Sequence, residues 1–141
     1  MNNRIKTACI ALTTLAIGLG GGLLLGSSAQ GQKVFELRTY TATPGNLDNL
    51  HARFRDHTIR IFQKHGMEVV GFWTPTDPEL ADDTLVYVLE HESQEAANAS
   101  WRAFGQDPEW QEVSEASNAN GPILGGVERQ YMIATDYSPL Q

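Results

Sequence analysis

The sequence predicts an α+β fold of the ferredoxin-like type, with the element order β-α-β-β-α-β and a four-stranded antiparallel sheet carrying the helices on one face. Four segments rich in β-branched and aromatic residues are spaced along the chain. Helical patterns follow the first and the third of these segments, so that each half runs strand, helix, strand. The length of 141 residues allows one domain and not two.

Residues 1–29 are predicted to be a signal peptide. Two basic residues precede an uncharged stretch over residues 7–26, and the small residue Ala29 stands where cleavage would occur. The uncharged stretch is also about long enough, at ~20 residues, to span a bilayer, so a retained N-terminal membrane anchor is the alternative. In both cases we expect the domain over residues 33–136 to be exported, either periplasmic or secreted.

The charge balance excludes some partners. The chain has 10 basic and 17 acidic residues, and removal of Arg4 and Lys6 would leave 8 against 17, a net charge of −9 with histidine neutral. A nucleic-acid-binding protein needs a basic face, so we expect no nucleic-acid partner. We expect membrane contact only if the N-terminal segment is retained. The single cysteine, Cys9, lies in that segment, so the mature domain would lack thiols and disulfides.

The first half of the domain begins with a strand over residues 33–42, which is rich in β-branched and aromatic residues. Thr43 or Asn46 is expected to cap the helix that follows the turn. Six residues recur at three- and four-residue steps and predict one face of that helix; they are Leu47, Leu50, Phe54, Thr58, Ile61 and His65. Gly66 is expected to end the helix in a left-handed conformation, and a second strand follows over residues 67–75.

The second half begins with a polar loop and a strand over residues 84–92, identified by its leucine, valine and tyrosine content. Ser93 is placed to cap a helix over residues 94–104. Asp107 and the proline that follows it predict a second helical piece that runs to residue 117. A last strand is expected over residues 126–135.

Alternate residues of the first strand divide into an apolar and a polar set. We expect the apolar set to face the helices and the polar set to face outward on the open side of the sheet. The apolar set is Phe35, Leu37 and Thr39, and the polar set is Glu36, Arg38 and Tyr40. An open face this mixed is usually covered by a second copy. The sequence therefore predicts a homodimer, a dimeric α/β barrel whose two sheets enclose a partly polar cavity.

The segments "FELRTYTATPGNLDNL", "KHGMEVVGFW", "ESQEAANASW" and "DPEWQEV" resemble a NIPSNAP domain, one of the dimeric α/β-barrel families, over roughly residues 34–133. The resemblance implies a ferredoxin-like protomer that pairs through its sheet. It supplies no catalytic motif. Related barrel families include cofactor-free oxygenases acting on aromatic substrates, haem enzymes and small isomerases, so the fold alone does not fix the function.

Arg38 and Tyr40 are the first candidates for ligand binding, because strand parity puts both on the face that we expect to be open. The planar fork of an arginine binds a carboxylate or enolate, and a tyrosine hydroxyl donates to the same oxygen. The alternative is a structural ion pair between Arg38 and Glu36 across the dimer interface.

Tyr87 and His91 share parity on the third strand and would line the same cavity if their side is the open one, which parity alone does not decide. A histidine there is a natural general base or haem ligand. Trp73, at the end of the second strand, is expected to be a core residue or part of the cavity wall.

The other histidines have simpler interpretations. His65 stands one residue before Gly66 and is expected to serve the helix end, which makes "KHGMEVVGFW" chiefly a joint between helix and strand. His57 lies at the edge of the helix stripe and is a second candidate haem ligand, and His51 is expected to be solvated. The sequence contains no metal-binding motif, nucleotide-binding loop or serine elbow, so we expect no metal site.

These residues support three functions. The first is an exported protein that binds a small organic ligand in the dimer cavity through Arg38, Tyr40, Trp73, Tyr87 and His91. The alternative is a cofactor-free monooxygenase or isomerase acting on a small aromatic or enolisable substrate, in which Arg38 stabilises an enolate and His91 moves the proton. The third is a haem-binding enzyme. No cofactor is predicted for the first two functions.

Overall fold

The computed structural model of the protein describes residues 32–141. The predicted signal peptide and the alternative membrane anchor, over residues 1–29, lie outside the described residues. Within residues 32–141, no helix combines the length and the apolar character that crossing a membrane requires.

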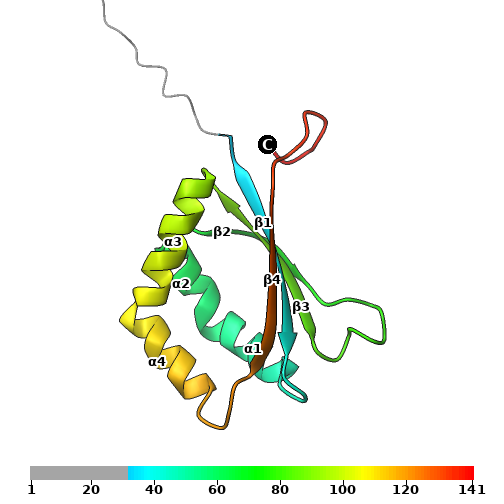
Figure 1. Cartoon of the computed structure of the whole chain (residues 1–141), viewed down its shortest axis with the longest axis vertical. Helices are drawn as coiled ribbons and strands as arrows, with labels where there is room; N and C mark the ends of the chain where they lie inside the picture. The colour runs from blue at the N-terminus through cyan, green and yellow to red at the C-terminus, as the bar shows by residue number, and fades with distance from the viewer. Residues whose placement is uncertain (1–31) are drawn as a thin grey trace, which may run out of the picture.

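The four strands form one antiparallel sheet, and the helices cover one face of it (Figure 1). The strands are β1 (Val34–Ala42), β2 (Glu68–Trp73), β3 (Thr84–His91) and β4 (Leu124–Met132), in the spatial order β2-β3-β1-β4. This arrangement confirms the predicted ferredoxin-like fold. The last strand begins and ends earlier than the sequence predicted.

The first helical segment is continuous but not uniform. It consists of α1 (Leu47–Arg53), a π-helical turn η1 (Phe54–Thr58) and α2 (Ile59–Lys64), where the sequence predicted a single α-helix. The hydroxyl of Thr58 donates to the carbonyl oxygen of Arg53, five residues earlier, at 3.1 Å. This bond supports the wider turn, and π-turns of this kind are frequent at functional sites.

The ends of this segment follow the expected chemistry only in part. Gly66 has φ 70°, which confirms the left-handed residue that ends the helix. At the other end Asn46 occupies the cap position without a side-chain cap hydrogen bond, and its amide instead donates to the Thr43 hydroxyl at 2.8 Å. The backbone N–H of Asn46 also donates to the Thr43 carbonyl oxygen at 2.9 Å, so backbone and side-chain bonds together hold the turn before α1.

The second helical segment is α3 (Gln94–Gln106) followed by α4 (Pro108–Ser117). The Ser93 hydroxyl accepts a backbone N–H of the first turn of α3 at 3.1 Å, and the Asp107 carboxylate accepts one of α4 at 2.9 Å. Both caps confirm the sequence prediction.

The core between the sheet and the helices is mostly aromatic. The ring of Phe54, from η1, lies at the centre, with four aromatic neighbours at ring-centroid distances of 5.2 to 6.0 Å. These neighbours are Tyr40, Phe62, Phe72 and Tyr87. Aliphatic residues of α1, α2 and β3 complete the core, among them Leu50, Ile61, Leu85 and Leu89.

Candidate functional site

The polar residues of β1 lie on the helix side of the sheet, which corrects the predicted assignment of its faces. Glu36, Arg38 and Tyr40 are 0%, 8% and 7% exposed. Tyr40 packs on Phe54 of η1, and Glu36 accepts a bond from Trp101 of α3, so this set points toward the helices. The alternation along the strand is as predicted, but the faces are exchanged because the core is aromatic and encloses an ion pair.

Glu36 is the centre of a buried polar network. Its carboxylate accepts from the Arg38 guanidinium at 2.8 Å and from the Trp101 indole N–H at 2.7 Å, and His91 Nε2 lies 2.8 Å away. Burial acts to raise the pKa of Glu36, but the hydrogen bonds from His91, Trp101 and Arg38 outweigh it, so the net pKa is lowered. The carboxylate is therefore held in its charged form.

Arg38 belongs to this network through its two terminal nitrogens, while its Nε, like that of a second buried arginine described below, has no acceptor among the described residues. Besides Glu36, its guanidinium donates to the Tyr40 hydroxyl at 3.0 Å and lies 4.2 Å from the centre of the Trp101 ring. Burial lowers the pKa of Arg38, but the surrounding Tyr40, Tyr87 and Glu36 side chains raise it further than burial lowers it. The ion pair with Glu36 lies within one protomer, and its contacts leave Arg38 little capacity for an external carboxylate.

Tyr87 and His91 lie on the same helix-facing side of β3. Tyr87 is 0% exposed, its hydroxyl has no hydrogen-bond partner among the described residues, and burial raises the pKa of this phenol well above its ordinary value. The His91 side chain is 1% exposed and its Nε2 contacts Glu36. A haem iron or a substrate could reach this imidazole only if the core opened.

Trp73 is separated from the other predicted site residues. It is 51% exposed and lies on the open face of the sheet, where it borders a pocket of about 410 Å³ together with Phe35, Val88 and residues of the C-terminal segment. The structure therefore brings Arg38, Tyr40, Tyr87 and His91 together in the protomer core, with Trp73 on the opposite face.

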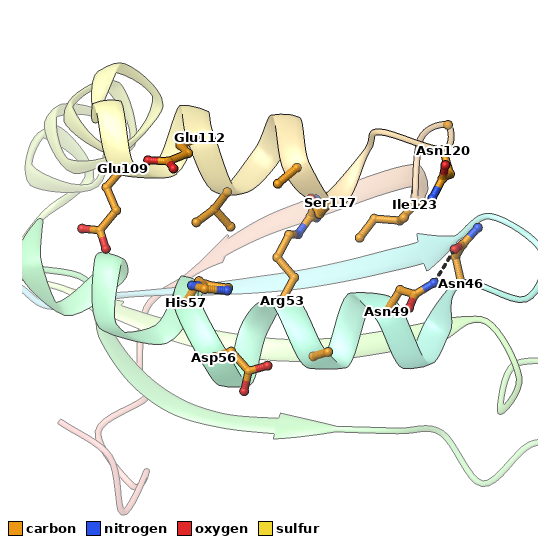
Figure 2. A pocket seen from close by; sticks show the side chains of 14 residues that line it. Asn46, Asn49, Arg53, Asp56, His57, Glu109, Glu112, Ser117, Asn120 and Ile123 are labelled. Atoms are coloured by element: carbon orange, nitrogen blue, oxygen red, sulfur yellow. Dashed lines mark hydrogen bonds between the residues drawn. The ribbon is translucent and has the colours of Figure 1, made fainter.

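A groove that the sequence did not reveal runs between α1–η1 and α4 (Figure 2). Its volume is about 670 Å³. Small side chains on both helices, Ala52, Ala116 and Ser117, leave this space between the backbones, and Val113 and Ile123 add apolar surface. The groove is thus on the helix side of the sheet, within one protomer.

Arg53 is the buried charge of this groove. Only 7% of the residue is exposed, and Figure 2 shows its side chain reaching from α1 toward Ser117 at the end of α4. Its Nη1 donates to the Ser117 hydroxyl at 3.3 Å, and its guanidinium carbon lies 5.3 Å from the centre of the Trp110 ring. Burial lowers the pKa of Arg53, and the nearby Tyr40 and Tyr87 only partly oppose this effect.

Arg53 lacks a carboxylate partner in the part of the chain that the structure describes. None of the ion pairs within residues 32–141 includes it, and its Nε is a buried donor without an acceptor. This residue was not predicted from the sequence, because helical periodicity places it off the apolar stripe. Its position directly before the buried Phe54, beside the small Ala52, was the only available signal.

The rim of the groove is acidic. Asp56 and Glu112 are exposed on either side of it, and a third carboxylate, Glu109, is already paired with Arg60. The imidazole of His57, from η1, is also exposed and borders the groove. Of the two candidate haem ligands, His57 alone has access to open space.

His65 has a structural role, although not the contact that was expected. Its Nε2 lies 2.6 Å from the Asp107 carboxylate, which joins the end of α2 to the junction of α3 and α4. Lys64 also contacts Asp107, and the hydrogen bonds from Lys64 and His65 lower the pKa of this carboxyl group. Residues 32–141 contain no cluster of histidine, cysteine and carboxylate side chains that could hold a metal ion.

Solved structures of other proteins share this fold. An uncharacterized NIPSNAP-like domain protein from Burkholderia xenovorans has 19% sequence identity and a TM-score of 0.67, with 77% of this chain and 90% of that chain covered. A NIPSNAP family protein from Agrobacterium tumefaciens has 17% identity and a TM-score of 0.67, with 77% and 99% covered. SnoaB from Streptomyces nogalater, a cofactor-independent oxygenase, has 15% identity and a TM-score of 0.50, with 77% and 99% covered.

The comparison with protein families agrees with the fold. No curated protein sequence matches this chain. The NIPSNAP family model matches residues 35–139, which include all four strands except the first residue of β1 and nearly all of the described residues. At these levels of identity the solved structures establish the fold alone, but the family match covers most of the chain, and the chain therefore belongs to the NIPSNAP family.

Proposed function

We propose that this chain is an exported NIPSNAP-family protein that binds a small organic ligand in the groove between α1–η1 and α4. The observation that supports this function is a groove of about 670 Å³ with a buried arginine, Arg53, that has no carboxylate partner among the described residues. Ligand sites of small molecules have volumes of roughly 300–1,000 Å³ and combine apolar walls with a few polar groups.

This location differs from the cavity between two sheets that the sequence predicted. Arg38 and His91 are occupied by Glu36 in the protomer core, so they are poorly placed to contact a ligand. The apolar character of the open sheet face, with Trp73 and Ile133 51% and 58% exposed, still supports pairing of two copies through that face. In such a homodimer each protomer would keep its own groove on the outside.

Native mass spectrometry tests ligand binding. The chain is expressed with its own N-terminal segment and purified in the form that the cell yields, which also reveals whether residues 1–29 are removed. We expect a bound small molecule on the wild type and on Ala103→Phe, an exposed site on α3, and its loss from Ala116→Phe, which fills the groove. If Ala103→Phe and Ala116→Phe retained the small molecule equally, its binding site would lie outside this groove. A wild type with no bound mass, and no metabolite that stabilises it against heat, would overturn the function.

A second function in the same groove is favoured by the position of His57 beside the groove that holds Arg53. In a cofactor-free isomerase, the imidazole would take a proton from the carbon next to a carbonyl group. The C–H electron pair would form the enolate, whose oxygen Arg53 would stabilise. Return of the proton to another carbon completes isomerisation, whereas transfer of electrons to O₂ begins the cofactor-free oxygenation that was the sequence-based alternative.

Hydrogen exchange of phenylpyruvate in D₂O, followed by NMR, tests the second function. We expect the wild type to accelerate exchange at the carbon next to the keto group, His57→Gln to lose the acceleration, and His51→Gln, outside the groove, to keep it. Exchange no faster than in buffer would remove the enzymatic alternative for this type of substrate, while ligand binding would be judged by the mass spectrum alone.

A further inference from the structure

The two arginines that are buried among residues 32–141 differ in whether a carboxylate compensates their charge. Arg38 and Arg53 are 8% and 7% exposed, so both are removed from water to the same extent. Arg38 pairs with the Glu36 carboxylate at 2.8 Å, whereas Arg53 has a single bond, at 3.3 Å, to the neutral Ser117 hydroxyl. A buried cation is stable only when an anion or several acceptors compensate it.

Ser117 is placed to orient Arg53 and not to neutralise it. Its hydroxyl donates to the Ser114 carbonyl at 3.1 Å, which leaves the oxygen to accept from Arg53 Nη1. Trp110 supports the guanidinium from α4, at 5.3 Å from the ring centre. Nη1 is the one nitrogen of Arg53 with a side-chain hydrogen bond among residues 32–141, so its guanidinium keeps donors without an acceptor. Arg38 also has a buried Nε without an acceptor, so the carboxylate partner is what separates the two arginines.

The surroundings restrict the charge of an anion that enters. Asp56 and Glu112 border the groove without an ion-pair partner among residues 32–141, and the chain carries a net charge of −7. This field opposes phosphates and other multiply charged anions more than it opposes a single charge. The apolar lining from Ala52, Val113 and Ile123 suits a ligand with a hydrocarbon body.

We infer that the groove binds a small monocarboxylate, with the carboxylate on the guanidinium of Arg53 and the hydrocarbon body along α4. Arginine and carboxylate match in planar geometry, so the pair forms two parallel hydrogen bonds. Ser117 is a positioning residue in this site. The inference rests on the proposed ligand-binding function and names the class of ligand.

Isothermal titration of the full chain with benzoate, phenylacetate and hexanoate, each matched to its neutral amide, tests the inference. We expect Arg53→Gln to weaken binding of the acids at least about tenfold, which corresponds to the loss of a charge-assisted hydrogen bond. Arg55→Gln removes an exposed arginine from the same helical segment outside the groove and should leave binding unchanged. Arg53→Lys keeps the charge without the fork and should give an intermediate loss.

Four results would overturn the inference, of which three concern the pattern of binding. The first is that the acids bind to the Arg53→Gln variant with the same affinity as to the wild type. The second is that the neutral amides bind to the wild type with the same affinity as the acids. The third is that inorganic phosphate displaces benzoate when the two are present at equal concentration. Failure of all three acids to bind the wild type would also overturn it. Circular dichroism confirms that each variant is folded. If neutral compounds bind and Ala116→Phe abolishes their binding, the ligand-binding function stands while the carboxylate inference fails.

Discussion

Two buried arginines, Arg38 and Arg53, show how neighbouring residues determine what a charge does. Arg38 forms an ion pair with Glu36 and its guanidinium lies over the Trp101 ring, so its main effect is on the stability of the fold. Arg53 is equally buried but contacts only neutral groups of α4 at the edge of an open groove. At the residue scale, the partner and not the degree of burial distinguishes the structural arginine from the candidate binding residue.

Glu36→Gln should destabilise the protein by about 3–5 kcal/mol in urea unfolding, because it leaves the Arg38 cation buried without its counter-charge. The matched control is Glu90→Gln, which removes a partly exposed pair with Lys33 and should cost less than about 1 kcal/mol. Equal losses in the two variants would mean that the buried pair contributes no more than a surface pair.

The pH dependence of stability follows from the lowered pKa of Glu36. A carboxyl group with a folded-state pKa below its ordinary value of about 4.5 stabilises the fold above that value, and the stabilisation is lost as the pH falls through the folded pKa. The difference in unfolding free energy between wild type and Glu36→Gln should therefore become smaller as the pH is lowered from about 5 toward about 2. This range follows from the lowered pKa of Glu36, because the carboxylate becomes protonated only below its ordinary pKa. A constant difference over this range would contradict the assignment.

The groove is a property of two elements together. The π-turn η1 shifts the register of the first helical segment directly after Arg53, and α4 presents Ala116 and Ser117 opposite. Small side chains on both elements keep the space open, while the aromatic core below η1 holds the segment in place. At the element scale, the irregular turn and the small residues are as important to the site as the charged residue.

Thr58→Val should lower the free energy of unfolding by about 1 kcal/mol, because it removes the hydrogen bond to the Arg53 carbonyl without changing the shape of a buried side chain. The control is Thr41→Val on β1, where the threonine is exposed and the change should fall within about 0.5 kcal/mol. Equal stability of the two variants would show that the hydroxyl does not support the π-turn.

The domain over residues 32–141 has two different faces separated by one sheet. The helix side carries the core and the groove, and the open side presents Trp73, Val70 and Ile133. Pairing of two copies through the open side would bury these residues and leave both grooves accessible. Ligand binding and dimerisation should therefore be separable by mutation.

Trp73→Glu should convert a dimer to a folded monomer in analytical ultracentrifugation and leave benzoate binding unchanged, because a charge on the open face prevents apolar packing there. Leu80→Glu, an exposed position in the loop between β2 and β3, should remain dimeric. A monomeric wild type, or a Trp73→Glu variant that still dimerises, would contradict pairing through this face.

The sequence was sufficient for the order of elements because their signals are local. The stripe from Leu50 to Ile61, the cap at Ser93 and the left-handed Gly66 each depend on residues a few positions apart. The exchanged faces of β1 could not be predicted, because an alternating Glu-Arg-Tyr set has the same pattern whether it meets solvent or an aromatic core.

The groove was beyond sequence reasoning for a different reason. Its main contact joins Arg53 to Ser117, 64 positions apart, and requires that α4 pack beside α1 and η1. Periodicity assigns a face to each helix but does not say which helix covers which residue. The candidate site thus depends on how the helices pack against each other, whereas the order of the elements follows from the pattern of residues along the sequence.

A crystal structure of the protein soaked with 4-bromobenzoate, in which anomalous scattering locates the bromine, would show whether the groove binds a carboxylate at Arg53. The proposed site places the carboxylate at Arg53 and the bromine in the groove between α1–η1 and α4. Arg53→Gln crystals treated in the same way should show no bromine there. A bromine in the pocket beside Trp73 on the open sheet face, or one that remains in the groove of Arg53→Gln, would contradict carboxylate binding at Arg53.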